Sequence, residues 1–131
     1  MTPLKRLDHG AVAVSDTEAA LEYFCGRLGL EVTSSEEIQT PHVRLTYLDA
    51  NPIFIQLVEP LDDASPIAAY VAEHGEGLHH IAFAVEDVPG TAAELADPGA
   101  PDVTVGSGRG KPSAFVPGDP HHGVRVEVTG L

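Results

Sequence analysis

The sequence of 131 residues has no tryptophan, one cysteine and few cations, and these scarcities narrow its possible functions. With Cys25 as its sole cysteine, the chain cannot form an internal disulfide, which favours a reducing compartment. Lys and Arg number 7 against 20 Asp and Glu, and the net charge of −13 argues against nucleic acid or an anionic membrane as a partner. No apolar run reaches the length of a membrane span, and the first residues lack the apolar region of a signal peptide. A soluble cytoplasmic protein is therefore expected.

The length suits one compact domain over residues 1–131, and a repeat divides it into two modules at about 5–60 and 76–131. The segments LDHGAVAVSD, starting at Leu7, and LHHIAFAVED, starting at Leu78, match at Leu, His, Ala, Ala, Val and Asp. Neither module alone is large enough to bury a sheet, so we expect the two to share one domain.

Helix signals mark two positions in the first part of the chain. Ser15 and Glu18 match a capping box, with Asp16 as a competing N-cap, and an apolar stripe follows at i, i+3, i+4 and i+7 until Gly29. The Ser-Pro pair at 65–66 predicts a short helix between the modules, since Ser is a good N-cap and Pro suits the first helical position.

Each module is predicted to contain a strand, a helix and three further strands, which makes the fold class α+β with two tandem βαβββ modules. In the second module, the helix is expected to begin at Asp87 and to be cut short by the Pro-Gly pair at 98–99. Alternating apolar residues and turn residues place the strands at about 7–14, 30–38, 42–49 and 53–59, and then at 78–85, 102–106, 113–116 and 123–128.

Four polar residues on these predicted strands repeat with the modules. His9 and His80 are 71 positions apart (80 − 9), and so are Gln56 and Glu127 (127 − 56). Imidazole, amide and carboxylate groups together suit a mid-row divalent metal ion. Gln56 also shares its strand face with apolar residues, where an unpaired buried amide costs roughly 1–3 kcal/mol. A lone strand histidine is more often a hydrogen-bonded core residue, but the shared offset of all four favours a metal site.

Longer motifs show a resemblance to a known family. The segments LVEPLDDASPIAAYV, GEGLHHIAFAV, GRGKPSAFVP and HHGVRVEV, together with LDHGAVAV, resemble the methylmalonyl-CoA epimerase branch of the vicinal oxygen chelate superfamily (glyoxalase, bleomycin resistance protein and dioxygenase). The resemblance extends nearly from end to end. It implies paired modules forming a cup-shaped mixed sheet around a metal, with His9, Gln56, His80 and Glu127 as the ligands.

The resemblance also implies a reaction and its partners. Co, Mn, Ni or Zn as a divalent ion would support epimerisation of (2R)/(2S)-methylmalonyl-CoA, or of a close acyl-CoA, by stabilising an enolate. A homodimer is expected. Lys111 and Ser113 belong to a loop that closes over the substrate in this family, so both are expected to bind substrate; Lys111 is one of only two lysines.

The proton carriers are the point at which the sequence departs from the family. The family glutamate that precedes the third strand is replaced by Thr40, which is not a base near neutral pH. His42 has a suitable pKa and is expected to share a strand face with Thr40, and Glu37 would reach the site only after a register shift. The alternative interpretation of His42 is an ordinary surface residue at a strand start. Glu127 could transfer a proton on one face only, so Glu127 and His42 are the expected catalytic pair.

Three other functions are compatible with the same residues. A related lyase or isomerase with one-sided proton transfer could act on a different dicarbonyl or α-oxo acid, and the loss of the family glutamate favours it. An iron oxygenase could use two His and one Glu as a facial triad, although Gln56 would occupy a position that oxygen needs. A small-molecule binding or resistance protein is disfavoured by the complete ligand set.

Overall fold

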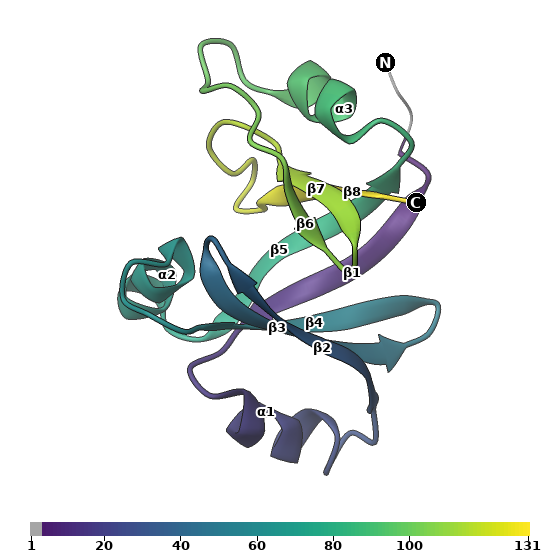
Figure 1. The fold of residues 1–131 in the computed structure, drawn as a ribbon, viewed down its shortest axis with the longest axis vertical. Coiled ribbons are helices and arrows are strands. Elements are labelled where there is room, and N and C mark those ends of the chain that lie inside the picture. Colours follow the sequence, from purple (N-terminus) through teal and green to yellow (C-terminus); the bar gives the residue numbers. More distant parts are fainter. Residues whose placement is uncertain (1–3) are drawn as a thin grey trace. The chain divides into compact units, whose positions relative to one another are not determined.

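The computed structural model describes residues 4–131, which form eight strands and three helices (Figure 1). The order of elements is a strand, a helix and three strands, then a connecting helix, then the same series again. This confirms the predicted α+β class with two βαβββ modules. The elements are β1 (Arg6–Ala13), α1 (Thr17–Phe24), β2 (Glu31–Gln39), β3 (His42–Ala50), β4 (Ile53–Pro60), α2 (Pro66–His74), β5 (Gly77–Val85), α3 (Val88–Leu95), β6 (Gly106–Gly108), β7 (Lys111–Phe115) and β8 (Val126–Gly130).

The chain divides into two compact units whose boundaries differ from those of the sequence repeat. One unit is Gly10–His79, and the other combines His80–Leu131 with the described residues up to His9. Strands β1 and β5 each run across a boundary, so each contributes residues to both units. The single domain over residues 1–131 stays a prediction.

The unit Gly10–His79 is an antiparallel sheet with a helix on each face. Strand β3 pairs with β2 on one side and with β4 on the other, and β1 lies beside β4. Because side chains alternate along a strand, Tyr47 and Val58 lie in one buried cluster with Ile67 of α2. Leu48 and Leu57 lie in a second cluster, against which α1 packs. The alternation of side chains along the strands therefore gives this sheet an apolar layer on each face, one covered by α2 and the other by α1.

The start of α1 differs from the predicted capping box. The Asp16 side chain accepts a hydrogen bond from the backbone N of Glu18 at 3.0 Å and is the N-cap, whereas the N–H of Ser15 donates to the carboxylate of Glu76 at 2.7 Å. Asp16 is preferred because the helix starts one residue later than the box requires. The predicted cap of α2 is confirmed, since Ser65 accepts from the backbone N of Ile67.

The second unit is a mixed sheet with one helix on it. Strand β5 pairs in parallel with β8, β8 pairs antiparallel with β7, and β7 with β6. The first residues of β1 lie beside β5, where the N–H of Lys5 donates to the carbonyl of Ala84 at 2.9 Å. Helix α3 packs on β7 and β8 over a core that includes Val85 and Val128. The opposite face of these strands is left for the polar residues described below.

Three features of the second module differ from the prediction, and one of them is the last strand, which was expected at 123–128 and is β8 at Val126–Gly130. Residues 102–106 were expected to form a strand, but residues 101–105 are irregular and pairing starts only at Gly106, which is opposite Ser113. Val103 packs against the core of this unit, which explains the apolar pattern without a strand. Residues 108–113, expected as a loop, form a hairpin instead, with Gly108 paired to Lys111. Among the described residues, no helix is long and apolar enough to cross a membrane.

Candidate metal centre

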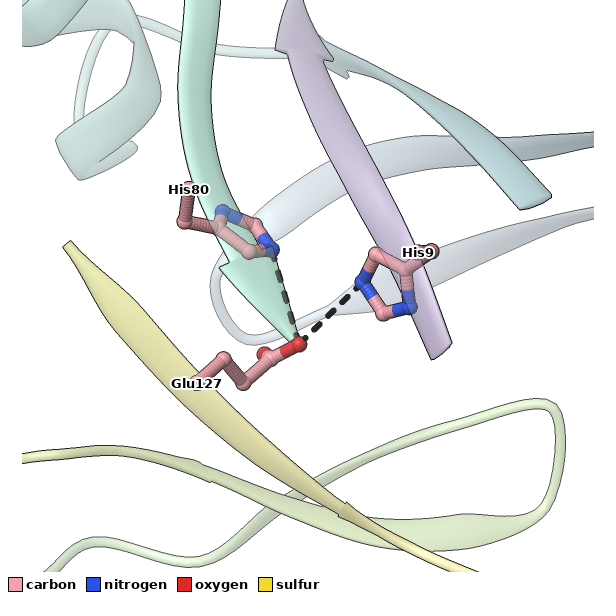
Figure 2. Close-up of side chains that lie close together, drawn as sticks. All are labelled: His9, His80 and Glu127. Atoms are coloured by element: carbon pink, nitrogen blue, oxygen red, sulfur yellow. Dashed lines mark ion pairs between the residues drawn. The ribbon is translucent and has the colours of Figure 1, made fainter. Parts of the chain in front are cut away.

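Three of the four residues in the repeated quartet converge in one unit. His9 on β1, His80 on β5 and Glu127 on β8 point toward one another (Figure 2). The Nε2 atoms of His9 and His80 lie 3.3 Å and 3.4 Å from Glu127 Oε1. Each residue offers one ligand atom, and the three atoms all lie within 4.8 Å of one another.

Strand register explains why these side chains meet. Ala82 of β5 is the partner of Glu127 on β8, and His80 shares a face with Ala82 because it is two residues away. This face is opposite to the one that carries Val85 and Val128 under α3. The side chain of Ala82 is a single methyl group and leaves space over the sheet, which the longer side chains of His80 and Glu127 can occupy.

Burial and charge at the centre are coupled. The side chains of His9 and His80 are 2% and 4% exposed, and that of Glu127 is 12% exposed. Burial would raise the pKa of Glu127, but hydrogen bonds from His80 and His9 outweigh it and lower the pKa to about 2. Burial would lower the pKa of His9, and hydrogen bonds to Asp8 and Glu127 outweigh it and raise that pKa. With a pKa of about 2, the Glu127 carboxylate is ionised near neutral pH, and a buried negative charge beside two imidazole nitrogens favours the binding of a cation.

The donor set fits a divalent metal ion. Two imidazole nitrogens and a carboxylate oxygen on a buried surface suit mid-row ions, and three protein ligands leave positions open for other ligands. Phe115, the strand partner of Glu127, contacts the ring of His80 edge-on at a centroid distance of 4.9 Å. An aromatic wall of this kind limits the room around the imidazole.

Two further residues at the centre were missed by sequence reasoning. Asp8 lies against His9, with Asp8 Oδ2 2.7 Å from His9 Nδ1, and Arg109 donates a short hydrogen bond to the same oxygen. A carboxylate beside a predicted ligand was a signal that could have pointed to Asp8, because ligating histidines usually donate their other N–H to such a group. The sequence holds no comparable signal for Arg109, which is 101 positions away.

Gln56, the fourth member of the quartet, lies in the unit Gly10–His79. Its side chain is buried, and its Nε2 donates a hydrogen bond of 2.7 Å to the hydroxyl of Tyr47, which is its register partner on β3. Gln56 Oε1 is buried and has no hydrogen-bond partner among residues 4–131. Tyr47 therefore orients the amide of Gln56, and the Oε1 atom of this amide is available to accept a further contact.

His42 lies at the start of β3 in the same unit as Gln56. Its Nε2 is 3.0 Å from Glu37 Oε2 and its Nδ1 is 3.4 Å from Asp62 Oδ2. The hydrogen bond with Glu37 raises the pKa of His42 and lowers the pKa of Glu37. The expected common strand face of His42 and Thr40 is wrong, because Thr40 is in the turn between β2 and β3. Both residues line a cavity of about 400 Å³ in this unit.

Lys111 and Ser113 lie on β7 rather than in a loop. Phe115 is opposite Glu127 and Ser113 is opposite Thr129, so the odd-numbered residues of β7 share the sheet face of Glu127. The two residues predicted to bind substrate therefore extend from the same face as the metal centre. Their role in binding stays a prediction.

Comparison with known proteins identifies the family. The model of the Glyoxalase/Bleomycin resistance protein/Dioxygenase superfamily matches residues 8–116. The chain belongs to this superfamily, as the sequence motifs predicted.

Its relatives include named enzymes. Ethylmalonyl-CoA/methylmalonyl-CoA epimerase of Cereibacter sphaeroides is 33% identical over 130 residues, which cover 94% of this chain and 96% of that protein. Human mitochondrial methylmalonyl-CoA epimerase is 28% identical over 130 residues, covering 95% and 73%. A Streptomyces coelicolor methylmalonyl-CoA epimerase variant, solved in complex with 2-nitronate-propionyl-CoA, has a TM-score of 0.83 at 32% identity and covers 98% of both chains. The predicted enzyme class, an isomerase similar to these epimerases, is confirmed.

Proposed function

We propose that this protein epimerises (2R)/(2S)-methylmalonyl-CoA, or a close acyl-CoA, in a reaction that depends on a divalent metal ion. The observation that carries the proposal is the convergence of His9, His80 and Glu127, whose ligand atoms lie within 4.8 Å of one another. The epimerase relatives, which match over nearly the whole chain, support the substrate class.

The proposed metal ligands are His9, His80, Glu127 and Gln56, and the ion is Co²⁺, Mn²⁺, Ni²⁺ or Zn²⁺. Gln56 is included because its Nε2 is taken by Tyr47 while its buried Oε1 has no partner among the described residues. Its place in the sequence repeat, equivalent to that of Glu127, supports the same role. When bound, the ion would supply positive charge that stabilises an enolate.

Epimerisation requires a proton to leave one face of the α-carbon and another to arrive on the opposite face. We assign these roles to Glu127 and His42. The hydrogen bond with Glu37 raises the pKa of His42, and this favours the protonated imidazole and its use as a proton donor. Thr40 takes no part in proton transfer. Lys111 and Ser113 are assigned to binding the acyl-CoA.

The test is deuterium incorporation from D₂O into (2R)- and (2S)-methylmalonyl-CoA, with metal-loaded and chelated enzyme. We expect exchange with loss of stereochemistry, and no exchange after chelation. Glu127→Gln should abolish both metal retention and exchange. Glu22→Gln, which removes an exposed carboxylate on α1, is the matched control and should exchange at the wild-type rate. Wild-type protein that is metal-loaded and catalyses no exchange would refute the proposal.

A second function is favoured by one observation. Thr40 stands where the family carries a glutamate, and the neighbouring His42 is held between two carboxylates. An enzyme with a single working proton carrier would transfer a proton on one face only, and would act as a lyase or isomerase on another dicarbonyl or α-oxo acid. Metal-dependent exchange with retention of configuration would identify this case. The homodimer stays a prediction, which light scattering in solution can test.

A further inference from the structure

The turn of the β6–β7 hairpin carries a residue that is unusual for its backbone conformation. Arg109 and Gly110 form the turn with φ angles of 54° and 72°. Two-residue hairpin turns of this kind need a positive φ at both positions and are usually built from Asn, Asp and Gly. An arginine is disfavoured there on backbone grounds. The presence of arginine at this position therefore indicates a role for its side chain.

The Arg109 side chain reaches across the unit to β1. Its Nη2 donates a hydrogen bond to Asp8 Oδ2, and the same oxygen lies 2.7 Å from His9 Nδ1. One carboxylate oxygen thus joins a guanidinium at the hairpin tip to an imidazole at the metal centre. The Asp8 side chain is 2% exposed and that of Arg109 is 15% exposed. Arg6 is also near Asp8, at 3.7 Å from Oδ1, but its side chain is half exposed.

This contact affects the ring of His9. A neutral imidazole carries one N–H, and the nitrogen that holds it is determined by the hydrogen bond it makes. In a neutral ring whose Nδ1 donates to Asp8, Nε2 carries no proton, and its lone pair is free to bind a metal ion beside Glu127. Asp8 can fulfil this role only as a carboxylate, and a buried carboxylate needs a cationic partner to remain ionised.

We propose that Arg109 is a positioning residue: it holds Asp8, and Asp8 in turn orients the ring of His9. Through this contact, the hairpin that carries Lys111 and Ser113 helps to orient a metal ligand. The inference rests on the proposed function, because it takes His9 as a ligand of the ion. A hydrogen-bond partner behind a ligand typically changes metal affinity or activity by about 10–100-fold. Arg109 contacts Asp8 and not His9 itself, so we expect the lower end of this range, and the loss of Arg109 should weaken metal binding by about 10-fold.

The variant that tests this is Arg109→Gly. Glycine suits the left-handed backbone of the turn, so the change removes the side chain while favouring the hairpin conformation. His122→Gly is the matched control, because His122 is the other described non-glycine residue with a positive φ (53°) and lies in an exposed loop. Co²⁺ affinity of the full chain is measured by competition with a chelator, and the melting temperature of the chelated protein is measured in parallel.

We expect Arg109→Gly to bind Co²⁺ about 10-fold more weakly with little change in melting temperature, and His122→Gly to bind it as the wild type does. Asp8→Asn should also weaken binding, and adding Arg109→Gly to it should have no further effect, because Arg109 acts through Asp8. Arg109→Lys should restore part of the affinity, and it also serves as the test if the glycine variant does not fold. Equal Co²⁺ affinity of wild type and Arg109→Gly, or additive losses in the double variant, would overturn the inference alone. Wild-type protein that does not bind Co²⁺ would overturn the proposed function as well.

Discussion

Replacing Glu127 with glutamine should change how the chelated protein responds to acid. The Glu127 carboxylate lies 3.3 Å and 3.4 Å from the Nε2 atoms of His9 and His80. These contacts overcome the effect of burial and lower the pKa of Glu127 from 4.5 to about 2. Glutamine has nearly the same shape and does not titrate, so a comparison of the two proteins isolates the charge.

The size and sign of the effect follow from this lowering. A pKa lowered from 4.5 to about 2 corresponds to roughly 3 kcal/mol of stability. Because the pKa is lower in the folded state, this stability is present above pH 4.5 and is lost as the pH falls toward 2. About 2 kcal/mol of it should disappear between pH 5 and pH 3.

The assay is urea unfolding of chelated wild type and Glu127→Gln at pH 7, 5 and 3. We expect the free energy of unfolding of the wild type to fall by about 2 kcal/mol more than that of the variant between pH 5 and 3. Glu22→Gln, at an exposed position, should behave as the wild type does. Parallel losses in wild type and Glu127→Gln would refute the interaction of Glu127 with the two histidines.

Three other predictions concern separate parts of the molecule. Lys111→Ala should raise KM for methylmalonyl-CoA about 10-fold with little change in kcat if Lys111 binds a CoA phosphate; an equal rise in steady-state KM for a thioester without the nucleotide would contradict this contact. The hydrogen bond with Glu37 raises the pKa of His42, so its stabilising effect is present below pH 6.5 and lost as the pH rises through the raised value. Urea unfolding should therefore show His42→Ala to be more destabilising at pH 5.5 than at pH 9, and a reversed order would be inconsistent with that pair. Leu57 is fully buried, and Leu57→Ala should lower the free energy of unfolding by about 2–5 kcal/mol in chemical denaturation, whereas a loss under 1 kcal/mol would count against the described core.

The sequence was sufficient to predict most of the elements and three converging side chains. Alternation of apolar residues located the strands of the first module to within about a residue at each end. The repeat selected His9, His80 and Glu127 because equivalent positions on equivalent strands are brought together when the modules share a fold. Gln56 was selected by the same repeat, and its part in the site stays a prediction.

Other features depend on contacts that local patterns do not encode. Asp8 should point away from His9 by simple alternation, yet its side chain bends to meet the Nδ1 atom. Arg109 was overlooked because its partner is 101 positions away and the turn that positions it was expected to be a loop. The segment 102–106 has the composition of a strand but no pairing partner in the described sheet, and tertiary pairing decides such cases.

The three converging side chains come from β1, β5 and β8, which are far apart along the chain. An ion held by them would close loops of 71 residues (80 − 9) and 47 residues (127 − 80). Closing loops of this length restricts the unfolded chain in the way that a disulfide does. A chain with one cysteine has no internal disulfide to draw on. The metal would then serve as a cross-link that works in a reducing compartment and can be removed and replaced without breaking a covalent bond.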